Sequence, residues 1–207
     1  MPRIRAASID EHKAITRGAL IDAARDLIEE AGTAEIALGQ VALAAGVGRT
    51  TLYDYFADRD DMIASMVEEE LPHVISDLIE SVSTHQPVDQ RLADLAAETV
   101  EFVASDPVFG VILHREVGRM SLATQERIRE SHAQLSTEMA GLYMQGVAEG
   151  IFMHMPPQLA GRLIQDTIMS AAKTLIDDDG SLGVALVTKS LRTFLLGGLA
   201  SSQGTGT

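Results

Sequence analysis

Apolar residues recur at intervals of three and four along most of this 207-residue chain, and this spacing constrains its fold more than any other feature. The clearest case lies between residues 159 and 176, where pairs of apolar side chains repeat every four residues. This spacing places the side chains on one face of an α-helix. We find no convincing alternation of the kind expected of a half-buried strand, so the sequence predicts an all-α protein.

Glycine and proline mark the ends of about nine expected helices. We expect these helices at residues 16–31, 38–45, 49–56, 62–79, 89–104, 108–119, 121–149, 157–176 and 182–199. Pro72 lies inside the fourth and should kink or break it. Three short helices followed by longer ones predict a small head and a larger helical body. The predicted division is a flexible arm over residues 1–15, a head over 16–61, a body over 62–200 and a disordered tail over 201–207.

The segment from Val41 to Phe56 is the most informative one, because it combines a short helix, a glycine turn and a second short helix. Gly46 can adopt a positive φ at the turn without steric cost. Leu52 and Phe56 are four residues apart and should both point inward from the second helix. The segment therefore predicts a helix-turn-helix unit.

Five residues of the second helix are left to face outward: Arg49, Thr50, Thr51, Tyr53 and Tyr55. Arginine can bind guanine with two hydrogen bonds, threonine can contact a base or a phosphate, and tyrosine hydroxyls donate well to phosphate. Asp54 lies among them and is unusual on a helix that faces DNA. It could accept a hydrogen bond from a cytosine amino group, or it could point away and repel phosphate.

The run from Ala19 to about Met62 resembles the DNA-binding head of TetR-family (tetracycline-repressor-like) transcriptional regulators. The matching residues are Ala23-Ala24, Leu27, Gly32, Val41-Ala42, Ala45-Gly46-Val47, Thr51-Leu52-Tyr53, Tyr55-Phe56 and Asp58-Arg59-Asp60. The resemblance implies that Thr16, Arg17 and Arg59 contact phosphate and that Arg49, Thr50 and Thr51 open the recognition helix. It also implies that Tyr53 and Tyr55 hold the DNA backbone.

Two positions depart from the family pattern, since Ala37 and Gly48 stand where the family commonly has a hydroxyl residue at a helix N-cap. Glycine is an acceptable N-cap and alanine a poor one. The second helix of the head is therefore expected to begin less firmly than in its relatives.

The resemblance implies a homodimer formed through the last two helices. The residues expected at that interface are Leu163, Ile164, Ile168, Ala171, Leu175, Leu191, Phe194 and Leu195. A simple alternative for each of them is burial in the core of a single chain. A two-fold dimer would suit a reader of palindromic DNA, whose half-sites lie about 34–36 Å apart.

The resemblance also implies a cavity in the body for a small effector, which we expect to be apolar or amphipathic. The candidate contacts are Phe109, His114, Met139, Tyr143 and Met144. Ordinary core packing is the alternative for each residue. The implied mechanism has two states, in which the effector favours a body conformation whose fourth helix moves the heads out of operator spacing.

Other functions find less support in the sequence. The chain has no cysteine, and its six histidines are scattered, so we expect no catalytic residues, no metal and no cofactor. A Glu-x-x-His spacing from Glu70 to His73 contains a proline. The alternatives left open are a small-molecule-binding protein with a degenerate head and, less favoured, a helical enzyme. Without a signal peptide or a run of about 20 apolar residues, we expect a cytoplasmic protein that does not enter membranes.

The formal net charge of -14 argues against tight binding to random DNA, because such binding depends on excess lysine and arginine. Residues 1–17 carry four basic and two acidic groups, whereas residues 62–207 carry nine and nineteen. The predicted head and arm together, residues 1–61, still have 7 basic and 11 acidic groups. The sequence therefore predicts a DNA-binding protein that depends on a few well-placed contacts, with Arg3 and Arg5 as further candidates in the arm.

Overall fold

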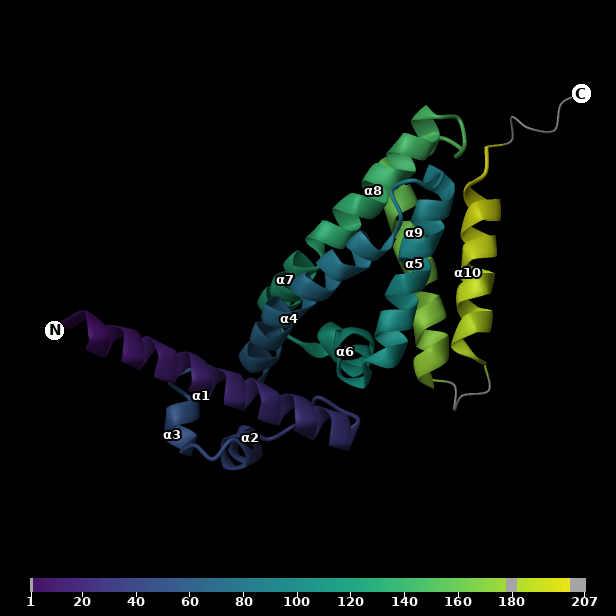
Figure 1. The fold of residues 1–207 in the computed structure, drawn as a ribbon. Coiled ribbons are helices and arrows are strands. Elements are labelled where there is room, and N and C mark those ends of the chain that lie inside the picture. Colours follow the sequence, from purple (N-terminus) through teal and green to yellow (C-terminus); the bar gives the residue numbers. More distant parts are fainter. Residues whose placement is uncertain (1, 178–181, 202–207) are drawn as a thin grey trace, which may run out of the picture. The chain divides into compact units, whose positions relative to one another are not determined.

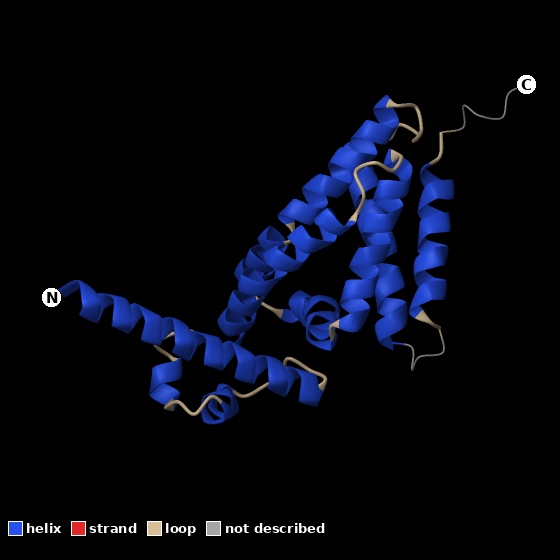
Figure 2. Ribbon diagram, in the orientation of Figure 1, coloured by secondary structure: helices blue, strands red, loops and turns tan. Residues whose placement is uncertain are grey.

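The computed structural model describes residues 2–177 and 182–201 (Figure 1). Every regular secondary-structure element in these residues is a helix, as Figure 2 shows. The α-helices are α1 (Pro2–Ala31), α2 (Leu38–Ala44), α3 (Arg49–Leu52), α4 (Arg59–Ser81), α5 (Val88–Ser105), α6 (Pro107–Val111), α7 (Leu122–Ser131), α8 (Ala133–Ala148), α9 (Pro157–Asp177) and α10 (Val184–Leu199). A π-helical turn, η1 (Ile112–Glu116), and a 3-10 turn, η2 (Val117–Arg119), follow α6. The prediction of an all-α protein is confirmed.

The chain forms two compact units. The first comprises Met1–Glu69 and Pro107–Ile128, and the second comprises Glu70–Asp106 and Arg129–Thr207. The boundaries fall inside α4 and α7, so each of these helices contributes to both units. The predicted head therefore lies in the first unit together with the start of α4 and the segment from α6 to α7.

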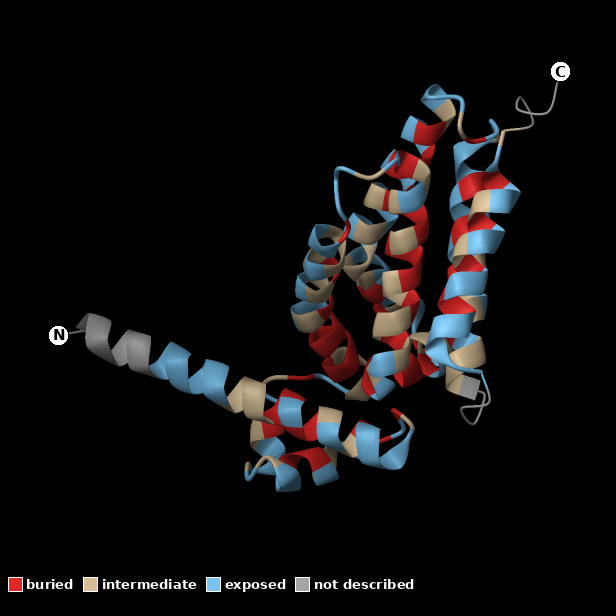
Figure 3. Cartoon of the chain, turned by 45° about the vertical axis from the view of Figure 1, so that its right-hand side comes forward, coloured by how far each residue is buried: buried red, intermediate tan, exposed pale blue. Residues whose placement is uncertain are grey.

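The first unit has a small core beneath α1. Helix α1 packs against α2 and α6, and α2 packs against α3. Leu20 and Ile28 of α1 are fully buried, as are Val41 of α2 and Leu52 of α3. Figure 3 shows buried positions in red and exposed positions in pale blue along the helices of the first unit.

Helix α1 begins at Pro2, so residues 2–15 of the expected arm are helical and continue into the helix predicted from residue 16. Residues 3–15 contain no glycine or proline and several good helix formers, and a proline fits the first turn of a helix well. The side chains of Arg3 and Arg5 lie outside the described part of the structure. So do residues 202–207 of the predicted tail.

Three further predictions about the helices differ from the structure. The recognition helix ends as an α-helix at Leu52 rather than Phe56, and hydrogen-bonded turns carry the chain through Asp54 and Tyr55. Pro72 does not break α4, which runs on to Ser81. The predicted helix over 121–149 is divided at His132, where serine and histidine, both modest helix formers, occupy consecutive positions.

The second unit is a helical bundle built around α5. This helix packs against α8, α9 and α10, and α9 also packs against α8 and α10. The core of the second unit contains Leu92, Ala96 and Val100 of α5 together with Ile164 of α9 and Leu191 of α10. The loop after α8 is joined to the end of α10, since Met153 N–H donates to Leu199 C=O and Ser201 N–H donates to Ile151 C=O, each over 2.8 Å. No helix among the described residues is long and apolar enough to cross a bilayer.

Candidate nucleic-acid interface

The turn of the helix-turn-helix unit has the predicted geometry. Gly46 has φ +68°, a conformation that residues with a side chain rarely adopt. Val47 N–H donates to Ala42 C=O over 2.9 Å, which closes the turn over the end of α2. Leu52 and Phe56 are 0% and 1% exposed, so their predicted inward positions are confirmed. The short recognition helix is therefore held by its two apolar anchors.

The N-caps of both head helices also agree with the sequence. Ala37 caps α2 and Gly48 caps α3, each in an extended conformation and each without a side-chain hydrogen bond to the helix. The first N–H groups of α2 and α3 are consequently not covered by a side chain of the cap residue. Such groups are the kind that bind anions at helix starts.

The five outward residues lie at the surface of the head. Arg49 and Thr50 are exposed, the side chain of Tyr53 is 47% exposed, and Thr51 and Tyr55 are half-buried. Arg49 and Thr50 are in the first turn of α3, and Tyr53 follows its last residue. This arrangement suits contact with a DNA groove, and the contact itself stays a prediction.

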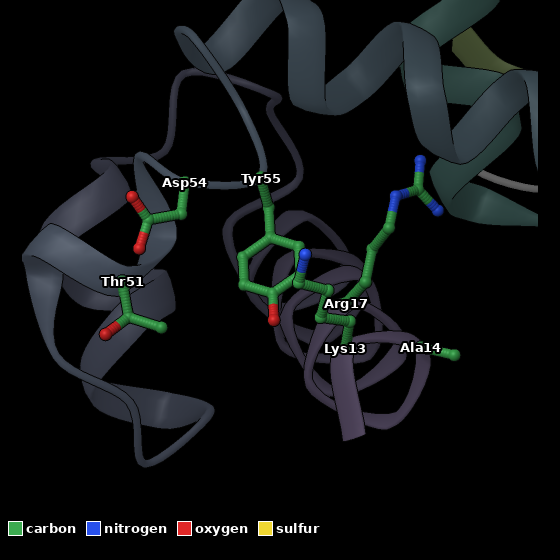
Figure 4. A pocket seen from close by; sticks show the side chains of 6 residues that line it. All are labelled: Lys13, Ala14, Arg17, Thr51, Asp54 and Tyr55. Atoms are coloured by element: carbon green, nitrogen blue, oxygen red, sulfur yellow. The ribbon is translucent and has the colours of Figure 1, made fainter. Parts of the chain in front are cut away.

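A hollow of about 550 Å³ lies between α1 and the turn that follows α3, residues 53–55, which we call the recognition turn. Lys13, Ala14 and Arg17 line it from α1, and Thr51, Asp54 and Tyr55 line it from α3 and the turn that follows. Figure 4 shows Thr51 and Asp54 on one side, the α1 residues on the other, and the ring of Tyr55 between them. Sequence reasoning missed Lys13, although it lies one helical turn before Arg17 and shares its face.

Each of the three side chains expected to contact phosphate from outside the recognition helix already has a partner within the protein. The Arg17 guanidinium pairs with Glu69 and lies 5.3 Å from the centre of the Phe56 ring. In Figure 4 it extends away from the recognition turn. The Thr16 hydroxyl donates to His12 C=O over 2.8 Å. Arg59 donates to Asp60 Oδ1 from Nη2 over 3.0 Å. A phosphate would have to compete with these partners.

The start of α4 is held by a group of charges that the sequence did not reveal. Arg127 of α7 donates to Asp61 Oδ1 and to both carboxylate oxygens of Glu68, each over 2.7 Å. Asp61 also accepts the Ala57 N–H over 2.9 Å. Burial raises the pKa of Asp61, but the Ala57 N–H and the Arg127 guanidinium outweigh burial, so the pKa lies below its ordinary value. The carboxylates of Glu68 and Asp61 in turn raise the pKa of Arg127.

The predicted effector residues are divided between the two units. Phe109 is buried in the first, with the Arg25 guanidinium 5.3 Å from its ring centre, and His114 lies in η1. Met139 and Tyr143 belong to the core of the second unit, whereas Met144 is 47% exposed. These placements do not test their contact with an effector.

Tyr143 has a packing role in the second unit. Its hydroxyl donates to Met153 C=O over 3.0 Å and accepts the Met155 N–H over 3.1 Å. Its ring stacks on Phe152 with centroids 6.0 Å apart. The Tyr143 hydroxyl therefore holds the loop between α8 and α9.

The apolar stripes of α9 and α10 each have an inward and an outward side. Ile164, Ile168, Leu191 and Leu195 are at most 5% exposed and belong to the core of the second unit, which excludes them from an outer surface of this chain. Ala171 and Leu175 pack against that core. Leu163 is 48% exposed and Phe194 is 65% exposed. Leu159 and Leu186, which the predicted interface did not include, are 48% and 55% exposed on the same helices.

Within the described ranges, no group of three or more histidine, aspartate and glutamate side chains is arranged to hold a metal ion. Residues 178–181, which include two aspartates, lie outside those ranges.

Two family models together match most of the chain. One, described as bacterial regulatory proteins, tetR family, matches residues 20–66. The other, described as tetracyclin repressor-like, C-terminal domain, matches residues 85–199. The first match covers the helix-turn-helix unit and the start of α4, and the second covers α5 to α10.

The similar proteins are bacterial regulators. The chain is 23% identical over 181 residues to the fatty acid metabolism regulator protein of Bacillus subtilis, covering 87% of this chain and 93% of that protein. It is 27% identical over 190 residues to the HTH-type transcriptional repressor KstR2 of Rhodococcus jostii, covering 89% and 91%.

Solved structures show the same fold. The transcriptional regulator FadR of Bacillus subtilis, solved in complex with stearoyl-CoA, is 23% identical with a TM-score of 0.76 and covers 87% of this chain and 98% of its own. The ketosteroid transcriptional regulator KstR2 of Mycobacterium tuberculosis is 25% identical with a TM-score of 0.64 and covers 90% and 95%.

Proposed function

Because this chain belongs to the tetR family of bacterial regulatory proteins, we propose that it is a homodimeric repressor that binds a palindromic operator and releases it when an amphipathic effector binds. The observation that carries the proposal is the geometry of the recognition helix. Leu52 and Phe56 are buried, while Arg49, Thr50 and Tyr53 remain at the surface. A helix anchored in this way can present a fixed set of side chains to a major groove.

The proposed effector is a long-chain acyl thioester of coenzyme A, which has an apolar tail and a charged head. One relative is named for fatty acid metabolism, and the structure of the Bacillus subtilis regulator contains stearoyl-CoA. The second unit of this chain is rich in large apolar side chains, including methionine, which adapts to varied apolar ligands. The acyl tail is the part of the ligand that this interior suits.

The proposed dimer interface is the outer face of α9 and α10. Leu159 and Leu163 lie four residues apart on α9, and Leu186 and Phe194 lie eight apart on α10, so each pair shares a helix face. These four side chains are 48–65% exposed in a single chain. Burial of side chains this large would favour association, and a second copy would bring a second recognition helix to the other half-site.

We expect the protein to have no catalytic role and to act in the cytoplasm, where bacterial DNA is accessible to a regulator.

The test is binding to DNA that flanks the protein's own coding region. We expect the purified protein to shift the anisotropy of such a labelled duplex, with affinity falling between about 50 and about 200 mM salt. Arg49→Ala and Tyr53→Phe should weaken binding, whereas Arg119→Ala in η2, outside the recognition helix and the proposed dimer face, should not. Failure to bind any such fragment at low salt would refute the proposal.

The effector is tested by adding ligand to the complex with DNA. Stearoyl-CoA should release the duplex, and free coenzyme A at the same concentration should not. If free coenzyme A releases the DNA equally well, the proposed role of the acyl tail is wrong. If neither ligand does so, the proposed effector is wrong while DNA binding stands.

A further inference from the structure

The hollow between α1 and the recognition turn carries charges of opposite sign. Lys13 and Arg17 line it from α1, and Asp54 lines it from the turn after α3. Asp54 therefore lines the same hollow as the two cations, and in Figure 4 its carboxylate lies on the side of Thr51.

The cations are not equivalent. Arg17 pairs with Glu69, so its charge is largely balanced inside the protein. The side chains of Lys13 and Asp54 are exposed, and neither forms an ion pair or side-chain hydrogen bond with any described residue. Lys13 and Asp54 thus set the net charge of the hollow, and that net charge is close to zero.

The hollow has the donors that a backbone phosphate needs. Tyr55 supplies a hydroxyl group and Lys13 supplies an ammonium group, and both side chains are drawn together in Figure 4. On a recognition surface, these groups would bind the sugar–phosphate backbone beside the groove that Arg49 and Thr50 enter. Asp54 alone among the lining residues would repel the phosphate.

We propose that Asp54 sets the strength with which the head binds any DNA, by opposing the attraction between Lys13 and a phosphate in this hollow. This inference rests on the proposed function. Because the repulsion acts on the backbone, it does not depend on the base sequence. The repressor then depends on base contacts from Arg49 and Thr50 to bind tightly, and its hold on random DNA is weak.

The alternative role for Asp54 is to accept a hydrogen bond from a cytosine amino group. Two observations favour the backbone role. Asp54 follows the last residue of α3, whereas Arg49 and Thr50 lie in its first turn. Asp54 also shares its hollow with α1 residues, which lie beside the recognition helix and not on it. The two roles predict opposite effects of the same substitution.

The experiment measures the affinity of Asp54→Asn for a random-sequence duplex and for the operator-containing duplex. At about 50 mM salt we expect binding to both to tighten by about threefold to tenfold. The gain should shrink at about 200 mM salt because ions screen the exposed charge. Lys13→Gln should weaken binding to both duplexes and reduce the salt slope by about one. The double variant should return to near the wild-type affinity.

Asp26→Asn is the matched control. It removes the same charge from an exposed position on α1, about 13 Å along the helix axis from Arg17 and outside the hollow. The inference is overturned if Asp54→Asn changes binding to random DNA no more than Asp26→Asn does. It is also overturned if Asp54→Asn weakens binding to the operator alone, which would identify Asp54 as a base reader. If the wild type and every variant fail to bind DNA, the proposed function itself is wrong.

Discussion

The Arg127 guanidinium donates to the Asp61 carboxylate over 2.7 Å, although the two residues lie 66 positions apart in the chain. Asp61 also accepts the N–H of Ala57, which belongs to the loop that leaves the recognition turn. One carboxylate therefore connects α7 to the first turn of α4 and to the segment just after the recognition helix. Within the first unit, a shift of Arg127 acts directly on the residues that position this loop.

The pH dependence of stability should reveal this carboxylate. Because the folded state lowers the pKa of Asp61, its contribution is complete above the ordinary value of 3.8 and is lost as the pH falls through the lower folded-state value. Asp61→Asn should therefore cost about 1 kcal/mol at neutral pH and progressively less below the ordinary value. Denaturant unfolding at a series of pH values measures this difference. Asp26→Asn should show no such convergence with the wild type, and a constant cost of Asp61→Asn at every pH would contradict the assignment.

Gly146 permits the stacking of Phe152 on Tyr143, since a Cβ at position 146 would overlap the Phe152 ring. Gly146→Ala should destabilise the protein by about 1–3 kcal/mol because the buried ring must move. Gly141→Ala is the control in the same helix, where an added Cβ has no neighbour within 4 Å. It should be neutral or stabilising by up to about 1 kcal/mol. Thermal unfolding compares the two variants, and equal effects would show that the ring contact is unimportant.

Ala37 is an exposed N-cap without a side-chain hydrogen bond, and its backbone is extended with φ -87° and ψ 127°. Ala37→Ser places a hydroxyl where it can accept the first N–H groups of α2. We expect a gain of about 0.5–2 kcal/mol in the free energy of unfolding, measured by denaturant unfolding. Ala44→Ser, the same change at the last residue of α2, should bring no gain. If Ala37→Ser is no more stable than the wild type, the cap hydroxyl does not reach the backbone.

Phe194 tests the proposed dimer face, because it is the most exposed aromatic side chain on α10. Phe194→Glu and Leu163→Glu should each yield a monomer in size-exclusion chromatography with light scattering, since a charge would be buried at the interface. Leu122→Glu changes a leucine that is 83% exposed on α7 and should leave the dimer intact. The operator affinity of the monomeric variants should fall because two heads no longer bind together. Dimers that persist in both variants would rule out this face.

The head could be predicted in detail because its signals are local. The positive φ of Gly46, the inward positions of Leu52 and Phe56 and the weak caps at Ala37 and Gly48 all follow from residue type within a few positions. The sequence places the start of α1 too late, because residues 3–15 are good helix formers without the clear apolar spacing that predicts a packed helix.

Contacts between distant segments could not be predicted in the same way. The pairing of Arg17 with Glu69 and of Arg127 with Asp61 depends on the packing of separate helices. The apolar stripe of α9 presented two adjacent rows, and only packing shows that Ile164 faces the core while Leu163 faces outward. Periodicity gives the face of a helix only to within a row, so it could not separate the buried row of α9 from the exposed row.

The bridge between the loop after α8 and the end of α10 has a consequence for how the chain comes apart. A helix normally frays at its carboxyl end, because its last carbonyl groups have no partners in the helix. Here the Leu199 carbonyl accepts the Met153 N–H, and Ser201 returns a second hydrogen bond to Ile151. Unwinding α10 from its carboxyl end therefore also releases the α8–α9 loop. At that end, the end of α10 and the α8–α9 loop therefore open together, and α10 does not lose its hydrogen bonds one residue at a time.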